Sequence, residues 1–447
     1  MWESPIYKFE RITDDPKTGN PKREIFAIDV TGSAPGMLVP GQQLENVFKL
    51  IAAGLKPENS KILDFGAAKL RNTLYLLKKG FHVYAVEFKK VYDRPQGKEF
   101  LEKCEKYKNF HKVTFPDGFY KLNEKFDLIL MINVLNVMPI FNERLCALAL
   151  CWDKLKDNGH LLIYHMRAAA SDPHKYSNTN KLNDGWLTAR DRQLQNFYVE
   201  PSKREIFAMA KATGFSFDPS FKFTGLVGNN HSYVFKSENI ILIEESLDLK
   251  GVRAGGEKHD PDKPIPEIEL SSLLPLYVKE LDKVEPGRGK GDAKKFHRLA
   301  ARILAGVFDT QLGEPKIEVE VDEGLGRIDL VFENKMENGF FKRLQSQINC
   351  PLISVECKNY QKDIENPEFD QLSGRLKPQR GMFGMLVCRG VKDKSKIIQQ
   401  CKTKLDKGEH IIVLCDDDLR NLVEAKLGEG DEAVDEYMSN KHNEILL

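Results

Sequence analysis

The sequence predicts an α/β protein of two domains, the first built on a parallel sheet, and three observations support this prediction. In the N-terminal half, short apolar runs alternate with amphipathic helical patterns, which is the order of strands and crossover helices in a parallel sheet. From Ala254 to Glu267 the chain is rich in Gly and Pro and poor in apolar residues, which is typical of a linker. Beyond this stretch the order of elements changes. We therefore expect a first domain at 1–249, a linker at 250–267 and a second domain at 268–447.

Each expected element follows from its local pattern of apolar residues. The first half contains predicted strands at 61–65, 82–87, 126–132 and 160–165, a helix at 142–155, and later a helix at 202–213 with strands from 215 and at 232–235. In the second half, a predicted helix at 293–308 precedes strands at 316–321, 327–332 and 351–357, a helix at 367–376, a strand at 382–388, a helix at 392–406 and a strand at 410–415.

Composition limits the function classes. The chain has 447 residues, more than one domain usually holds, and its net charge of +1 excludes a polybasic, histone-like protein but not a locally basic surface. No apolar run reaches the roughly 18–20 residues of a membrane helix, and the N-terminus lacks a signal-peptide pattern. We therefore expect a cytoplasmic protein without a membrane partner. The eight cysteines form no Cys-x-x-Cys pair, which argues against a disulfide framework or a zinc ribbon.

A candidate nucleotide-cofactor site lies in the first half. Asp64, Gly66 and Ala68 fall in a small-residue turn between a strand and a helix. Such a turn lets the backbone approach a ligand closely, and the helix N-terminus adds dipolar stabilisation. The next strand ends at Glu87, 23 residues after Asp64, where a carboxylate can accept hydrogen bonds from ribose hydroxyls. The turn and the acid together predict a cofactor that contains a ribose.

These residues resemble the cofactor motif of class I S-adenosylmethionine-dependent methyltransferases, and the resemblance covers roughly residues 40–236. It implies a Rossmann-like methyltransferase sheet with S-adenosylmethionine (SAM) as cofactor. The cofactor-binding residues that it implies are Asp64, Gly66 and Ala68 in the loop, Glu87 at the ribose, Asp117 near the adenine and Asn133 at the end of the fourth strand. Ala68 and Leu70 replace the second and third loop glycines of the family, which would crowd the cofactor and weaken its binding.

The methyl acceptor stays open at this point. The run from Asn133 to Pro139, followed by Glu143 and Arg144, is similar to methyltransferase-like proteins encoded beside bacterial DNA-modification systems. However, the fourth strand does not end in the Asn/Asp-Pro-Pro-aromatic motif of amino-methylating DNA enzymes, and the chain has no Pro-Cys pair for cytosine C5 chemistry. A small molecule or a protein therefore remains an alternative acceptor, and a fold retained with a dead site is a further alternative.

The second half places charged residues at the ends of apolar strands. Asp329 lies on the polar face of the alternating run at 327–332. At the end of the strand at 351–357, Glu356 and Lys358 lie on the same face, because side chains of a strand alternate with a period of two. Charged side chains near a core are costly, which suggests a purpose. Two converging carboxylates can hold Mg²⁺, and a nearby lysine can position water and stabilise charge that develops on a phosphate.

This Asp…Glu-x-Lys pattern resembles the PD-(D/E)xK restriction-endonuclease-like superfamily over about residues 290–420. The resemblance implies a restriction-endonuclease-like α/β domain at the C-terminus. The residues that it implies are Asp329, Glu356 and the Cys357 carbonyl as metal ligands, Lys358 as catalytic lysine and Gln371 as a supporting catalytic residue. Arg375 stands one helical turn after Gln371.

Three features of the second half depart from that pattern or leave it open. The long spacing between Asp329 and Glu356 requires an inserted loop at 334–350. His297 stands where related nucleases often carry a glutamate. Glu318 and Glu320 share a strand face and are either a third carboxylate for the site or, as we prefer, a solvated face.

The two resemblances together imply a Mg²⁺-dependent DNA endonuclease fused to a SAM-binding domain, in bacterial restriction-modification or anti-phage defence. The expected partner is double-stranded DNA, and paired-site cleavage would favour a homodimer. An alternative from another class is a sensor, in which the first domain binds a ligand and gates a nuclease-fold domain that only binds nucleic acid. The single experiment that best separates these functions is a cleavage assay with Mg²⁺, with and without SAM.

Overall fold

The computed structural model describes residues 4–14, 21–33, 48, 54–166, 181–189, 194–217, 225–227, 230–237, 268, 270–287, 290–321, 326–335, 339–360 and 362–447. Contacts between Cα atoms group the described residues up to 237 into one compact unit and those from 270 onward into a second. The predicted linker at 250–267 lies outside the described residues.

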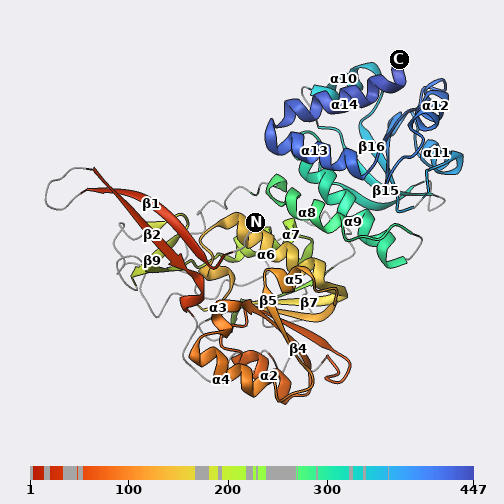
Figure 1. The fold of residues 1–447 in the computed structure, drawn as a ribbon. Coiled ribbons are helices and arrows are strands. Elements are labelled where there is room, and N and C mark those ends of the chain that lie inside the picture. Colours follow the sequence, from red (N-terminus) through yellow and green to blue (C-terminus); the bar gives the residue numbers. More distant parts are fainter. Residues whose placement is uncertain are drawn as a thin grey trace. The chain divides into compact units, whose positions relative to one another are not determined.

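The N-terminal unit is built on one large sheet with the strand order β5-β4-β3-β6-β7-β13-β11, and β12 pairs with β13 (Figure 1). Neighbours from β5 to β7 are parallel, and β13 is antiparallel to β7. The strands are β3 (Lys61–Phe65), β4 (His82–Phe88), β5 (Phe110–Phe115), β6 (Phe126–Ile132), β7 (Leu155–Met166), β11 (Phe215–Phe217), β12 (Gly225–Val227) and β13 (Asn230–Ser237).

Helices cover this sheet, as its buried strands require. In β6 every residue but Asp127 is buried, as expected for a parallel strand with helices on both faces. Leu76 of α2 and Phe100 of α4 join Ile62 and Val83 of the sheet in one buried cluster. The helices of the unit are α2 (Arg71–Lys78), α3 (Lys89–Tyr92), α4 (Pro95–Cys104), α5 (Asp117–Tyr120), α6 (Phe141–Lys154) and α7 (Lys203–Ala212), with a short 3-10 helix, η2 (Leu135–Val137).

A second sheet, which the sequence analysis missed, has the order β1-β2-β10-β9-β8. Its strands are β1 (Ile6–Asp14), β2 (Pro21–Asp29), β8 (Lys181–Leu182), β9 (Gly185–Ala189) and β10 (Leu194–Tyr198), and the 3-10 helix η1 (Val30–Ser33) follows β2. The antiparallel pair β1 and β2 projects from the rest of the unit (Figure 1). Phe26 and Ile28 are buried at the base of β2, whereas Ile12 and Ile25 are exposed, so only one end of the hairpin is packed.

The C-terminal unit contains a five-stranded sheet of order β14-β15-β16-β17-β18. The pairs β14–β15 and β15–β16 are antiparallel, and β16–β17 and β17–β18 are parallel. The strands are β14 (Lys316–Val321), β15 (Gly326–Glu333), β16 (Leu352–Lys358), β17 (Phe383–Cys388) and β18 (His410–Leu414). β17 is buried throughout, which fits its central place between two parallel neighbours.

The helices of this unit are η7 (Leu270–Leu273, a 3-10 helix), α8 (Leu274–Leu281), α9 (Lys290–Val307), α10 (Gly339–Gln347), α11 (Asn366–Ser373), α12 (Lys394–Leu405), α13 (Asp416–Gly428) and α14 (Asp431–Leu446). Four α-helices of this unit, α8, α10, α13 and α14, and the 3-10 helix η7 were not predicted from the sequence. The segment 334–350, which we expected as an inserted loop, contains the helix α10. Phe340, Phe341 and Leu344 are buried there at helical spacing, so packing of this apolar face stabilises the helix.

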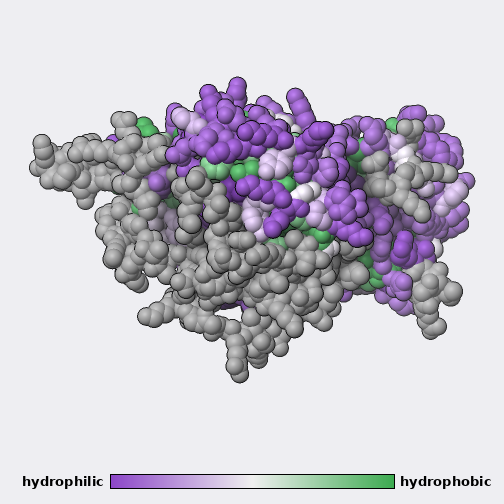
Figure 2. Space-filling view, turned by 90° about the horizontal axis from the view of Figure 1, so that it is seen from below, coloured by the Kyte–Doolittle hydropathy of each residue, from purple (hydrophilic) through white to green (hydrophobic). Residues whose placement is uncertain are grey.

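The surface agrees with the mixed composition. On the face drawn in Figure 2 the described residues are mainly hydrophilic, and apolar residues occur between them in small groups. Within the described ranges, no helix is both long enough and apolar enough to cross a membrane.

Candidate functional site

The first candidate site is the turn between β3 and α2. Its backbone passes through the left-handed region three times, with φ of 73° at Gly66, 48° at Ala68 and 59° at Leu70. The amides of Gly66 and Ala67 both donate to the carbonyl of Val86 on the neighbouring β4, at 3.0 Å each. Ala68 and Leu70, which stand where the resembling family has glycines, therefore adopt a backbone conformation that glycine usually adopts. This conformation strains the backbone at both residues.

Gly66 and Leu70, two of the left-handed residues of the turn, are both closely packed. A Cβ on Gly66 would lie 2.7 Å from Cγ2 of Val134, so this position has no room for a side chain. Leu70 has no exposed side-chain surface and immediately precedes α2, which places its strained backbone against a packed core. Tertiary packing therefore compensates for the missing glycine at this position.

Two carboxylates hold this turn. Asp64 at the end of β3 is buried and accepts a hydrogen bond of 2.6 Å from Thr73 Oγ1 on α2. Glu87 on β4 accepts from the amide of Ala68 with Oε2 and from the amide of Phe88 with Oε1, each at 2.8 Å. Burial raises the pKa of Asp64 to about 6 and that of Glu87 to about 7, against the opposing effect of these hydrogen bonds. Glu87, the residue predicted to bind the ribose, thus also fixes the backbone conformation of the loop.

The other predicted cofactor residues lie at the same carboxyl edge of the sheet. Asp117 is exposed and begins α5, directly after β5. Asn133 follows β6 with φ of 56°, and its amide donates to the Tyr164 carbonyl at 2.7 Å. The chain runs from β3 to β4 on one side and returns to β6 on the other, so this edge is the topological switch point of the sheet. The fold therefore gathers all the predicted residues around the usual ligand position of such sheets.

Beyond Asn133, the small second sheet meets the end of β6. The amide of Val199, just after β10, donates to the carbonyl of Asn136 in η2 at 2.8 Å. Asn136 is buried, and its Oδ1 has no hydrogen-bond partner among the described residues. The sequence analysis included Asn136 in the run after the fourth strand but gave it no role.

Buried ion pairs hold the second sheet to the large one, and sequence reasoning missed them. At the end of β2, Asp29 is buried and lies 2.7 Å from Lys90 Nζ and 3.3 Å from Arg94 Nη2, on the segment that follows Glu87. The hydrogen bonds from Lys90 and Thr31 outweigh burial, so the pKa of Asp29 is lowered. The sequence carried no signal for this contact, because its partners are more than 60 residues apart.

A second anchor is Arg144 on α6, which is completely buried. Its guanidinium donates to both carboxylate oxygens of Asp184, at 2.5 and 2.8 Å, and to the Met138 carbonyl at 2.9 Å. Glu205 Oε1 of α7 lies 3.4 Å from Nη1. In the sequence, Arg144 stands out only because it follows the run from Asn133 to Pro139 that is similar to methyltransferase-like proteins. Its position shows that it joins the β8–β9 turn to the helices behind the sheet.

The second candidate site lies at the carboxyl end of β16. Lys358 Nζ donates to Glu356 Oε1 at 2.7 Å and to Gln371 Oε1 of α11 at 2.9 Å. Gln371 Nε2 in turn donates to Glu356 Oε1 at 2.5 Å. Asp329 on β15 accepts from the amide of Cys357 at 2.9 Å through Oδ2. The structure therefore brings together the five predicted residues of this site.

Burial sets the electrostatics of this cluster. Burial, and then the adjacent charge of Asp329, raise the pKa of Glu356 to about 7, although Lys358 opposes the shift. For Lys358, the lowering effect of burial is outweighed by Glu356, so its pKa is raised. Glu356 Oε2 is buried and has no hydrogen-bond partner among the described residues. One carboxylate oxygen of Glu356 is thus paired with Lys358 and Gln371, and the carboxyl groups of Glu356 and Asp329 adjoin each other.

Neighbouring residues refine the predicted site. His297 of α9 places Nδ1 3.9 Å from Asp329 Oδ2, where the resemblance leads to a glutamate. Glu318 and Glu320 are exposed on β14, and Glu318 lies 3.7 Å from Arg327, which supports the solvated interpretation of this pair. The side chain of Cys357 is buried on the opposite face of β16 from Glu356, so only its main chain could serve a ligand.

The donor set of this site suits a hard cation. Over the described ranges, no cluster of three or more His, Cys, Asp and Glu side chains has the arrangement of a metal site. Mg²⁺, however, usually takes only one or two carboxylates and completes its shell with water and phosphate. The unpaired Glu356 Oε2 beside Asp329 fits that requirement.

The first half also has relatives among known proteins. Residues 42–218 match the family described as "Methyltransferase domain". Among solved structures, the chain is similar to a SAM-dependent methyltransferase from Methanosarcina mazei, with 17% identity over 42% of this chain and 97% of that chain, at a TM-score of 0.33. It is also similar to the CcbJ methyltransferase from Streptomyces caelestis, with 14% identity over 47% and 95% of the chains and a TM-score of 0.35. A search of curated proteins gave no match.

The family match and the sheet topology agree over the same part of the chain. The matched residues 42–218 contain the strands β3 to β7 and the loop after β3. The order β5-β4-β3-β6-β7 is that of a Rossmann-like sheet with its switch point beside β3. Residues 42–218 of this protein therefore match a methyltransferase-domain family and contain a sheet with a Rossmann-like strand order.

Proposed function

We propose that the N-terminal domain binds SAM and transfers its methyl group. The observation that carries this proposal is the turn after β3, where Gly66, Ala68 and Leu70 all adopt left-handed backbone beside Glu87. Each oxygen of Glu87 accepts one backbone amide and can accept a further bond, so the residue suits ribose hydroxyls. When bound, SAM would supply an activated methyl group, and the loop, Glu87, Asp117 and Asn133 would hold and orient it.

For the acceptor we propose a small molecule or a protein. The segment after β6 reads Asn133-Val134-Leu135-Asn136 and lacks the motif that grips the amino group of a flipped base. The second sheet, held by Asp29 and Arg144, contacts this segment through the hydrogen bond from Val199 to Asn136 and would line the approach to the end of β6. A compact acceptor or an exposed side chain fits such an approach better than a base flipped out of a duplex.

Calorimetry with SAM tests the cofactor proposal. Glu87→Gln keeps the size of the side chain but turns one of its two accepting oxygens into a donor, so it should weaken SAM binding about tenfold, which corresponds to the loss of one hydrogen bond to a charged group. Glu124→Gln is the matched control, because Glu124 pairs with the half-exposed Lys61 at the other end of β3. No heat of SAM binding to the wild-type protein would contradict the proposal.

For the C-terminal domain we propose Mg²⁺-dependent hydrolysis of DNA phosphodiesters. The unpaired Glu356 Oε2, next to Asp329 and the ammonium group of Lys358, carries this proposal. The mixed sheet, with β15 and β16 antiparallel and β16 and β17 parallel, agrees with the expected element order. We also propose that the protein acts in restriction-modification or anti-phage defence. The only support for this is that the two resemblances occur in one chain.

Each residue of the site would have a distinct role in such a reaction. Asp329, Glu356 and the Cys357 carbonyl would hold the Mg²⁺, whose charge polarises phosphoryl oxygens and lowers the pKa of bound water. Lys358 would stabilise the negative charge that develops on the phosphate. Gln371 keeps the Lys358 ammonium in place through its Oε1 and occupies the same Glu356 oxygen with its Nε2.

A cleavage assay on double-stranded DNA with Mg²⁺ tests this second proposal. Lys358→Ala should abolish cleavage and leave the fold intact. Lys362→Ala is the matched control, because Lys362 lies in the same segment but is exposed and pairs only with the exposed Glu365. Equal cleavage rates of the wild type and Lys358→Ala would contradict the nuclease proposal. Cleavage without any SAM binding would instead make the first domain a scaffold.

A further inference from the structure

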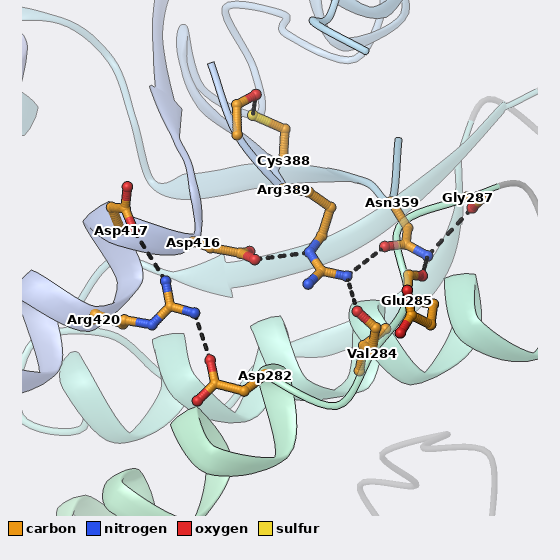
Figure 3. A network of polar contacts seen from close by, with 11 residues as sticks. Asp282, Val284, Glu285, Gly287, Asn359, Cys388, Arg389, Asp416, Asp417 and Arg420 are labelled. Carbon is orange, nitrogen blue, oxygen red and sulfur yellow. Dashed lines mark hydrogen bonds and ion pairs between the residues drawn. The ribbon is translucent and has the colours of Figure 1, made fainter. Parts of the chain in front are cut away.

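A buried polar network begins at the residue that follows Lys358 in the chain (Figure 3). Its first member is Asn359, the residue after the catalytic lysine, which is 2% exposed. Asn359 Nδ2 donates to the carbonyls of Glu285 and Gly287, at 3.0 and 3.3 Å. The main-chain carbonyl of Asn359 accepts from the amide of Gly287 at 2.9 Å. Three bonds thus tie the carboxyl end of β16 to the segment between α8 and α9.

The second member is Arg389, which follows β17 as Asn359 follows β16. Its Nη1 donates to Asn359 Oδ1 at 2.9 Å and to the Val284 carbonyl at 2.6 Å, and its Nε donates to Asp416 Oδ2 at 2.8 Å. The guanidinium lies over the ring of Phe296 of α9, 5.2 Å from its centroid. Figure 3 shows Arg389 between Asp416 on one side and Asn359 on the other. One planar group therefore connects two strand ends, α13, α9 and the 284–287 segment.

We infer that Asn359 and Arg389 are positioning residues for the Lys358 site. Lys358 is one residue from Asn359, and the register pairs it with Cys388, the residue before Arg389. Phe296, which stacks on Arg389, adjoins His297, which faces Asp329. The network therefore fixes both the strand end that carries the lysine and the helix that faces the carboxylates. This inference rests on the hydrolysis proposed above.

The chemistry of the network explains why these two residue types are needed. An amide side chain donates with its nitrogen and accepts with its oxygen, and Asn359 uses both in opposite directions. Only a guanidinium can make the forked contacts of Arg389 while its plane covers an aromatic ring. A lysine at position 389 would retain the charge beside Asp416 but lose the fork.

Single-turnover cleavage with saturating DNA is the first measurement. Asn359→Ala and Arg389→Lys should lower the cleavage rate about 10- to 100-fold, the cost of a misplaced catalytic group, and leave the Kd for DNA unchanged in Ca²⁺. Arg420→Ala is the matched control, because Arg420 of α13 bonds Asp282 in the same segment and Asp417 on its own helix, but bonds neither Asn359 nor Lys358 (Figure 3). Its cleavage rate should equal that of the wild type.

Hydrogen exchange is the second measurement, and it does not depend on cleavage. Amides of β16 and of residues 284–287 should exchange faster in both variants, whereas those of β3 and β4 should not change. A variant that cleaves at the wild-type rate, or one that is slower only through weaker DNA binding, would overturn the inference. So would unchanged exchange in β16. Wild type and Lys358→Ala, run together, show separately whether the proposed hydrolysis occurs. If it does not, the proposed function fails, and the exchange data then show only whether the network holds the end of β16.

Discussion

Glu356 and Lys358 form an ion pair along one face of β16, with 2.7 Å between Oε1 and Nζ. The side chain of Glu356 is 1% exposed and that of Lys358 is 11% exposed, so the pair is largely removed from water. A buried pair of this kind contributes little to stability on its own, because desolvation offsets the attraction. Its retention at the end of an otherwise apolar strand is better explained by a function that uses both charges.

The first prediction concerns the pH dependence that Glu356 creates. Burial raises its pKa from 4.5 to about 7, so the folded protein binds this proton more tightly than the unfolded chain does. The stabilising effect is complete below about pH 4.5 and is lost as the pH rises through about 7. Relative to Glu356→Gln, the wild type should therefore lose stability over this interval.

Denaturant unfolding in the presence of a chelator, followed by circular dichroism, measures this difference. Glu320→Gln serves as control, because Glu320 is exposed on a neighbouring part of the sheet. A stability difference between wild type and Glu356→Gln that stays constant from about pH 4.5 to 8 would contradict the prediction.

The second prediction compares two positions in the turn after β3. Gly66→Ala should destabilise the N-terminal domain by about 1–3 kcal/mol, because φ is 73° and the new Cβ would meet Val134 at 2.7 Å. Ala68→Gly relieves a left-handed alanine and should stabilise the domain by up to about 1 kcal/mol. Tryptophan fluorescence reports this domain, since the three tryptophans, at 2, 152 and 186, are all in the N-terminal half. Equal effects of both substitutions would be inconsistent with the strained turn.

The elements that the sequence predicted are those with strong local signals. Strands such as 61–65 and 126–132 are mainly apolar runs, and the structure has β3 and β6 at these residues. Glu356 and Lys358 could be predicted because the strand period puts them on one face. Asp329 could be matched to them because it is the acid on the polar face of the alternating strand at 327–332. The residue pattern thus located groups that the fold brings close together, while their roles stay predictions.

The parts that could not be predicted depend on long-range contacts. The second sheet joins β2 to β10 across more than 160 residues, and no local pattern shows that pairing. Arg144 and Asp184 become partners only when that sheet forms. Asn359 had no apparent role in the sequence, because its hydrogen-bond partners at 285 and 287 are more than 70 residues away.

The third prediction concerns Arg144, whose side chain has no exposed surface. Arg144→Met leaves Asp184 and the buried Glu205 without their cation, so the N-terminal domain should lose about 3–5 kcal/mol of stability. Arg23→Met is the matched control, because Arg23 pairs with Glu10 on the exposed hairpin with 80% of its side chain in solvent, and should change stability by less than about 1 kcal/mol. Urea unfolding followed by tryptophan fluorescence measures both. Similar losses in the two variants would mean that Arg144 does not anchor the second sheet.

The fourth prediction concerns a histidine pair in the C-terminal unit. His410 Nδ1 and His442 Nε2 are 2.8 Å apart, and Phe340 and Phe383 pack against the His442 ring. Burial, and then the neighbouring His410, lower the pKa of His442 from 6.5 to about 4. The unfolded chain therefore binds this proton more readily than the folded protein. Stability should be complete above about pH 6.5 and should fall as the pH drops toward 4.

His442→Gln should reduce this loss, because glutamine fills a similar space and does not titrate. Hydrogen exchange of α14 and β18 at a series of pH values between about 4 and 7.5, corrected for intrinsic rates, gives the local stability of the unit in both proteins. His111→Gln is the control, since His111 stacks on Tyr84 in the other unit and should leave α14 unchanged. A wild-type stability that does not fall below about pH 6.5, or a variant with the same slope as the wild type, would show that the histidine pair is not the titrating group.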